Sequence, residues 1–200
     1  MSRLPRKALA IELAVLLVAA AILLALQDLS FTTDDLSRGG KGYVSDEIWY
    51  VSSARNILEK VFGAQPRQVQ GLGATVVYEG TLNSSFLEGL SRACNVSYRS
   101  DYYKISAVYV EASSPTRLEC FLDGLRSAVK VNDVVYGWML PDTQGIDTYM
   151  NLEHPPAGKY VLCLEMLLLG DYPTYWRIGP IVAGLATLAL TVLAVRELTG

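Results

Sequence analysis

The residues best suited to chemistry fall in two short segments that lie far apart in the chain. The first is the acidic pair Asp46-Glu47, which the sequence pattern places at the start of a helix. The second is "NLEHPPAGKY", residues 151–160, where charged side chains surround a double proline. A positioned carboxylate can act as a general base, and a lysine or a histidine can bind a phosphate. The candidate groups of the second segment are Glu153, His154 (the only histidine) and Lys159.

Each of these residues also has a purely structural interpretation. Asp46 and Glu47 would favour the dipole of a helix that starts beside them. Lys159 would extend its charged end toward the headgroups of a membrane. His154 would bond a backbone carbonyl next to its proline turn. The residue types alone leave both interpretations open.

The chain is more apolar than an ordinary soluble protein. Of its 200 residues, 51% are hydrophobic and only 18% are charged. Two apolar runs, residues 8–26 and 178–195, approach the length of roughly 20 residues that a helix needs to cross a bilayer. The first run contains Glu12, which either extends toward the nearby end of the span or contacts another helix. It is longer than a typical signal-peptide core and lacks a convincing cleavage site, so we predict an uncleaved anchor.

The positive charges predict how these spans are oriented. Three basic residues precede the first run, and another follows the second run. We therefore predict a two-pass cell-membrane protein with cytoplasmic ends, residues 1–7 and 197–200, and an external part, residues 27–176. Two Asn-x-Ser tripeptides, at Asn83 and Asn95, agree with an external location.

The predicted fold class is an α+β membrane protein. Transmembrane helices at 8–26 and 177–196 would flank the large external part. Its sections would be 27–63, with the Asp-Glu helix, an inserted small β-α-β-α-β subdomain at 64–147, and 148–176, with the proline turn. The expected elements are helices at 45–62 (begun by Ser45), 84–94 and 114–129, and strands at 74–80, 105–113 and 132–140 of a parallel or mixed sheet.

The helix expected at 157–171 is short and apolar. It cannot span a bilayer, and it is too apolar to be free in water. We therefore expect a juxtamembrane helix that lies along the membrane surface or against other helices.

The cysteines and the net charge exclude several classes of site. Three cysteines at irregular spacing form neither a zinc site nor a disulfide framework. A bridge between Cys94 and Cys120 with Cys163 left over is one interpretation, and three isolated apolar cysteines are the other. No group of residues has metal-ligand spacing. With a net charge of -3 and no basic stripe, we expect no nucleic-acid partner.

The two candidate segments resemble a known family of membrane enzymes. "SDEIWYVSSARNIL" is similar to the Asp-Glu…Tyr…Ala-Arg signature of the dolichyl-phosphate-mannose–protein mannosyltransferases, the protein O-mannosyltransferases. "NLEHPPAGKYVLCLEMLLLGDYPTYWRIGPIVAGL" is similar to their His-Pro-Pro-Leu-Gly-Lys segment, which continues through Gly-Asp-x-Pro and Trp-Arg into the second span. This family belongs to the GT-C class of glycosyltransferases, as do the aminoarabinose transferases. The resemblance covers residues 8–62 and 151–198.

The resemblance implies transfer of a mannose-like sugar from a polyprenyl (dolichyl) phosphate to an external acceptor protein or lipid. Asp46 would be the general base, and Glu47 would position the acceptor or the donor. Lys159 and His154 would face the lipid phosphate. No cofactor is implied with certainty, and the need for a metal is left open. The residues implied to line the substrate site are Tyr50, Arg55 (for which pairing with a carboxylate is the alternative) and Glu153.

Three departures from the family pattern qualify these expectations. Ala157 stands where the family has leucine, and residues 64–147 are inserted between motifs that normally lie closer together. Family members also have many spans, whereas two are predicted here. The missing helices belong to a companion chain, or the sequence is a fragment or a degenerate paralogue. Of these, we expect an N-terminal module that needs the helices of a companion polytopic subunit. The alternative is a non-catalytic two-span membrane protein whose external α/β domain binds a partner protein.

Overall fold

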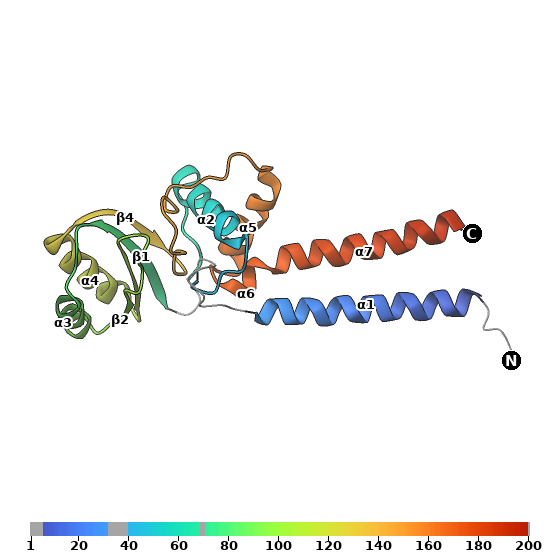
Figure 1. The fold of residues 1–200 in the computed structure, drawn as a ribbon, viewed down its shortest axis with the longest axis horizontal. Helices are drawn as coiled ribbons and strands as arrows, with labels where there is room; N and C mark the ends of the chain where they lie inside the picture. Colours follow the sequence, from blue (N-terminus) through green and yellow to red (C-terminus); the bar gives the residue numbers. More distant parts are fainter. Residues whose placement is uncertain (1–5, 32–39, 69–70, 200) are drawn as a thin grey trace. The chain divides into compact units, whose positions relative to one another are not determined.

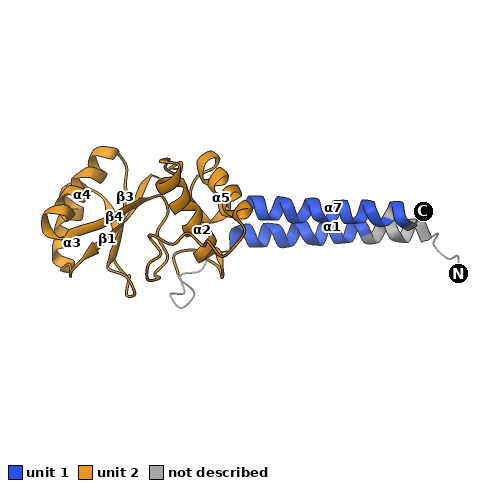
Figure 2. Cartoon of the chain, turned by 90° about the horizontal axis from the view of Figure 1, so that it is seen from above, with its two compact units in different colours: residues 1–31, 177–200 blue, residues 32–176 orange. Residues whose placement is uncertain are grey.

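The computed structural model describes residues 6–31, 40–68 and 71–199, which divide into two compact units (Figure 2). One unit contains the two terminal helices. The other contains the sheet and the shorter helices, within residues 32–176. Residues 1–5 and the side chains of Glu12 and Arg196, which bear on the predicted topology, lie outside what the structure describes.

The helical unit consists of α1 (Arg6–Ser30) and α7 (Ile178–Thr199), which run side by side (Figure 1). Within the described residues, one helical stretch, Pro173–Val195, is long and apolar enough to cross a membrane. The apolar stretch found in α1 is shorter, Ala14–Ser30, so a second span is not shown. Where α1 ends and α7 is about to begin, the guanidinium of Arg177 donates to the backbone carbonyls of Asp28 and Phe31.

The other unit contains a four-stranded antiparallel sheet. Its strands are β1 (Leu72–Glu79), β2 (Ser97–Arg99), β3 (Ala107–Ala112) and β4 (Lys130–Tyr136). Their order in the sheet is β2-β3-β1-β4, and every neighbouring pair is antiparallel. Helices α3 (Ser84–Cys94) and α4 (Pro115–Ala128) pack on one face (Figure 1). The chain order β-α-β-β-α-β with this strand order is the split β-α-β, or ferredoxin-like, topology.

This sheet corrects the predicted β-α-β-α-β subdomain with its parallel or mixed sheet. The missed strand, β2, has only three residues, too few to show an alternating pattern. Because β2 pairs directly with β3, the chain reverses before β3 reaches β1, and all neighbours become antiparallel. The predicted helices at 84–94 and 114–129 are confirmed. Asn83 and Ser114 cap them, each accepting a backbone N–H of the first turn.

The core of this subdomain follows from the two-residue period of its strands and the 3.6-residue period of its helices. On β1, Ala74 and Val76 alternate toward the helices, and on α4, Phe121, Leu122 and Leu125 form the facing apolar stripe. All five side chains are buried.

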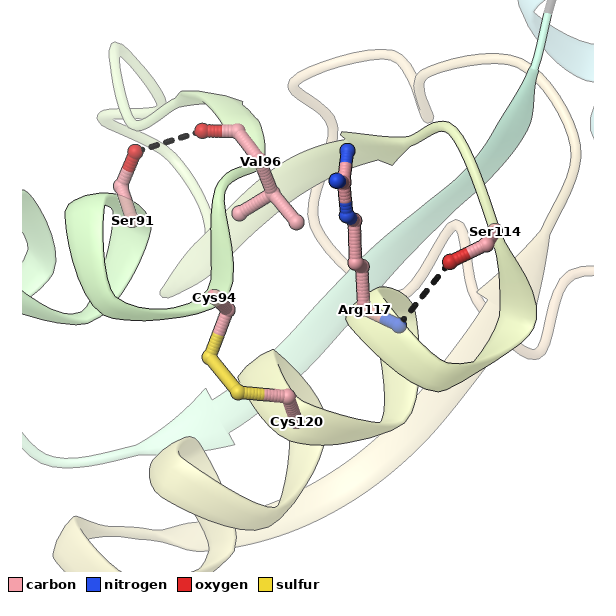
Figure 3. The surroundings of a disulfide bond; sticks show 6 residues. All are labelled: Ser91, Cys94, Val96, Ser114, Arg117 and Cys120. Carbon is pink, nitrogen blue, oxygen red and sulfur yellow. Dashed lines mark hydrogen bonds between the residues drawn. A yellow bond between two sulfur atoms is a disulfide. The ribbon is translucent and has the colours of Figure 1, made fainter.

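A disulfide joins the two helices of the subdomain (Figure 3). Cys94, the last residue of α3, is bonded to Cys120 in the middle of α4, with 5.7 Å between their Cα atoms. Of the two interpretations of the cysteines, the structure therefore shows the bridge. Cys163 is free and buried.

Removing this bridge should destabilise the sheet subdomain. Cys94→Ala with Cys120→Ala should lower the free energy of unfolding by about 2–4 kcal/mol, because the bridge closes a loop with a sequence separation of 26. Denaturant unfolding of the full chain in detergent micelles measures the change. A reductant should lower the unfolding midpoint of the wild type and leave that of the double variant unchanged. A midpoint that does not respond to reduction in the wild type would contradict the prediction.

The helix that carries the Asp-Glu pair begins later than expected. It comprises α2 (Glu47–Asn56) and a π-helical continuation, Ile57–Val61. Asp46, not Ser45, is the N-cap, so the prediction for Ser45 is wrong: its φ of 52° turns the chain just before the helix. The Glu47 carboxylate accepts the N–H of Val44 and fixes this turn.

Helix α5 (Pro156–Leu168) packs on α2, and the short α6 (Pro173–Trp176) completes their core. The polarity of α5 is the reverse of that of a helix on a soluble domain, because its two charged side chains, Lys159 and Glu165, are 3% and 7% exposed. Its exposed residues include no charged side chain, and the large ones among them are Tyr160, Val161, Leu164, Leu167 and Leu168. Such a face favours an apolar environment.

Candidate functional site

The two segments with candidate chemistry lie against each other in the folded chain. The Asn56 amide of α2 donates to the carbonyl of Tyr149, with 2.8 Å between nitrogen and oxygen. The Trp49 ring meets the Tyr149 ring edge-on at 5.0 Å between centroids, and Tyr50 meets His154 in the same way at 5.6 Å. The helix that begins with Asp46-Glu47 therefore packs against the His-Pro-Pro turn.

Asp46 is the more available carboxylate of the acidic pair. Its side chain is exposed and makes no capping hydrogen bond to α2. The half-buried Glu47 holds the preceding turn instead. This arrangement leaves Asp46 accessible to a hydroxyl and gives Glu47 a structural task in addition to any contact with substrate.

Lys159 is buried beneath the proline turn. Its ammonium donates to the carbonyls of Met150, Asn151 and His154, and the last of these bonds is 3.1 Å long. The side chain therefore ties the turn to the first turn of α5, and direct contact with a phosphate would require these bonds to be exchanged. Among the described residues no carboxylate lies within salt-bridge distance of the ammonium, although its charge interacts with the carboxylate of Glu153.

His154 is the exposed member of the predicted phosphate-binding pair. Its Nδ1 lies 2.6 Å from the side-chain oxygen of Asn151, so its partner is an amide side chain and not the backbone carbonyl considered as the alternative. The other ring nitrogen, Nε2, is the atom available to a ligand.

Glu153 is exposed beside the same turn, and its carboxylate accepts the hydroxyl of Tyr149. This hydrogen bond is the main reason that the pKa of Tyr149 is raised to about 12 and that the pKa of Glu153 is lowered. Glu153 is therefore ionised at neutral pH and adds a negative charge near His154.

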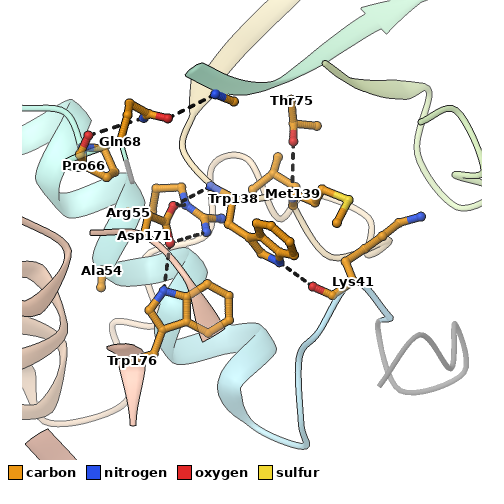
Figure 4. A network of polar contacts seen from close by, with 12 residues as sticks. Lys41, Ala54, Arg55, Pro66, Gln68, Thr75, Trp138, Met139, Asp171 and Trp176 are labelled. Atoms are coloured by element: carbon orange, nitrogen blue, oxygen red, sulfur yellow. Dashed lines mark hydrogen bonds and ion pairs between the residues drawn. The ribbon is translucent and has the colours of Figure 1, made fainter. Parts of the chain in front are cut away.

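Arg55 has no exposed surface, so the structure does not place it in a substrate cavity. Its guanidinium binds Asp171 through two hydrogen bonds of 2.7 and 2.9 Å (Figure 4). It also donates to the hydroxyl of Tyr43. Burial alone would lower the pKa of Arg55, but the Asp171 carboxylate and Tyr43 outweigh it and raise the pKa. The alternative left open by the sequence, pairing with a carboxylate, describes the observed geometry.

Asp171 is the centre of this buried network. Besides Arg55, it accepts the indole N–H of Trp176 at 2.8 Å and the backbone N–H of Trp138 at 3.0 Å (Figure 4). Gly137 permits this approach: its φ is 115°, and a Cβ there would lie 2.1 Å from a carboxylate oxygen of Asp171. The network joins α2, the end of the sheet and α6.

Two residues of this region did not stand out in the sequence. Asp171 belongs to the Gly-Asp-x-Pro motif, which was the available signal. Asn151 precedes the His-Pro-Pro segment and gave no signal. Within the described residues no three His, Cys, Asp or Glu side chains are grouped so that they could hold a metal ion.

Comparisons with protein-family models, with curated proteins and with solved structures give no match for this chain. A functional assignment therefore rests on the site itself and on the resemblance of its two motifs.

Proposed function

We propose that the chain is the N-terminal module of a membrane glycosyltransferase. It would transfer a mannose-like sugar from a polyprenyl (dolichyl) phosphate to an external acceptor protein or lipid, together with membrane helices of a companion polytopic subunit. The observation that supports this proposal is the contact between Tyr50 and His154, which brings the helix that follows the acidic pair against the His-Pro-Pro turn.

The proposed reaction uses the exposed groups of this site. As the acceptor hydroxyl attacks the anomeric carbon, Asp46 takes its proton, and the bond between that carbon and the phosphate oxygen breaks. The bonding electrons leave with the phosphate. His154 and the positive charge of the buried Lys159 stabilise the developing negative charge there. No group besides the lipid-linked sugar and the acceptor is needed to balance the reaction.

The membrane placement is part of the same proposal. The apolar stretch Pro173–Val195 would cross the bilayer, and a second span would lie in α1. The outward apolar face of α5 would rest in the lipid interface, at the depth of a lipid phosphate. Residues 27–176 would face the outside, where the Cys94–Cys120 bridge is stable.

The proposal can be tested in native membranes. Membranes from cells that lack the chain should lose transfer of labelled sugar from polyprenyl-phosphate mannose, and re-expression of the chain should restore it. A photoreactive polyprenyl phosphate should also label the peptide containing residues 151–160. Unchanged transfer without the chain, combined with no labelling of that peptide, would contradict the proposed function.

One observation favours the second candidate, a non-catalytic protein whose α/β domain binds a partner protein. Arg55 and Lys159 are both engaged in internal contacts, as expected where motifs persist for structural reasons. In that case transfer would not depend on the chain, and a crosslinker would join the sheet subdomain to another protein.

A further inference from the structure

Asn151 touches both members of the proposed phosphate site. Its side-chain oxygen lies 2.6 Å from Nδ1 of His154, and its backbone carbonyl accepts the ammonium of Lys159. It is 1% exposed and has a φ of 50°, a conformation that asparagine, aspartate and glycine adopt more readily than other residues. Asn151 is thus a fixed part of the turn, with its amide placed against the imidazole.

We propose that Asn151 is the positioning residue of His154. It fixes Nδ1 as a hydrogen-bond donor and leaves Nε2 as the ring atom that meets a ligand. This inference rests on the proposed function in one respect only: that function makes the ligand an anionic phosphate oxygen of the lipid-linked donor.

The assignment follows from the hydrogen-bonding capacity of the two groups. An amide oxygen only accepts, so the ring nitrogen that faces it carries a hydrogen. A neutral imidazole has one N–H, so the second proton of His154 arrives and leaves at Nε2. With that proton in place, Nε2–H points away from Asn151 and donates to an anionic oxygen.

The amide of Asn151 is not an ordinary structural anchor. Its oxygen contacts His154 and, at 3.3 Å, the hydroxyl of Tyr149, whereas its buried Nδ2 has no hydrogen-bond partner among the described residues. Buried amides that only hold a turn together normally have both ends bonded. The tie to Lys159 uses the backbone of Asn151, so the side chain can be changed without removing that tie.

The single histidine makes a direct test practical. In the full chain in nanodiscs, the ¹⁵N shifts of the imidazole report which nitrogen carries the proton of the neutral ring. The wild type should show Nδ1–H. Asn151→Gly, which keeps the positive φ, should revert to the Nε2–H form, while Asn151→Asp, which keeps an acceptor oxygen, should retain Nδ1–H. Tyr149→Phe is the matched control, because it removes a neighbouring contact of the amide and should leave Nδ1–H in place.

The outcomes separate this inference from the proposed function. The role of Asn151 would be overturned if the wild-type ring carried its proton on Nε2. It would also be overturned if the ring of Asn151→Gly kept its proton on Nδ1, whatever the stability of the variant. Added inorganic phosphate should shift the Nε2 resonance of the protonated imidazole in the wild type, because Nε2–H then donates to an anionic oxygen. A resonance that phosphate never moves would overturn the phosphate assignment, while a tautomer that follows Asn151 would still support its positioning role.

Discussion

Asp46→Asn should lower the rate of sugar transfer by about 10²- to 10⁴-fold, the usual contribution of a positioned general base. Asparagine has the shape of aspartate but cannot take the proton of the acceptor hydroxyl. Because asparagine is an equally good N-cap, and because Asp46 makes no capping bond, α2 should remain intact. Initial rates with polyprenyl-phosphate mannose, in native membranes that contain the variant, measure this effect.

The matched control for this variant is Glu88→Gln on α3. Glu88 is also an exposed carboxylate, and its contact with Arg92 is a surface ion pair of 3.5 Å. Its loss should leave transfer unchanged. If Asp46→Asn retained full activity, Asp46 would not be the base, and the second candidate function would gain support.

Asp171→Asn should cost about 3–5 kcal/mol of stability, because it leaves the guanidinium of Arg55 buried without a counter-charge. The two side chains are 0% and 1% exposed, so water cannot replace the lost carboxylate. Both carboxylate oxygens of Asp171 accept hydrogen bonds, from Arg55, Trp138 and Trp176. Asparagine has only one side-chain oxygen, so some of these donors would lose their acceptor. Denaturant unfolding of the full chain in micelles, followed by tryptophan fluorescence, measures the change.

An exposed ion pair provides the comparison for Asp171. Asp123→Asn removes a contact with Arg126 in which the side chains are 72% and 46% exposed, and it should cost at most about 1 kcal/mol. Equal losses from the two substitutions would show that burial does not set the cost of Asp171→Asn.

Local patterns predicted the elements that are regular over several turns. The helices at 84–94 and 114–129 have an apolar stripe and a capping residue at the right place, and both are present in the structure. The three-residue β2 has no such pattern, so the antiparallel sheet could not be foreseen. Ser45 suits an N-cap by residue type, but Asp46 takes that place because Glu47 reaches back to the preceding turn.

In the candidate site, too, local features were predictable from the sequence and contacts between distant segments were not. The acidic pair and the His-Pro-Pro turn were identified because their residue types are close together in sequence. The pairing of Arg55 with Asp171 crosses 116 positions, and nothing local specifies which carboxylate a buried guanidinium will meet. The contact of Asn151 with His154 is local, but it depends on a left-handed residue that the sequence does not mark.

The pairing of β1 with β4 bears on how a protein with separated motifs can evolve. Ala74 lies opposite Tyr136, and the N–H of Gly137 is bonded to the carbonyl of Gly73, so the chain enters and leaves the sheet subdomain at neighbouring points. An insertion with adjacent ends can be gained, lost or exchanged without pulling its flanking segments apart. The sheet subdomain of such a protein could therefore be replaced as a module while the two motifs keep their contact.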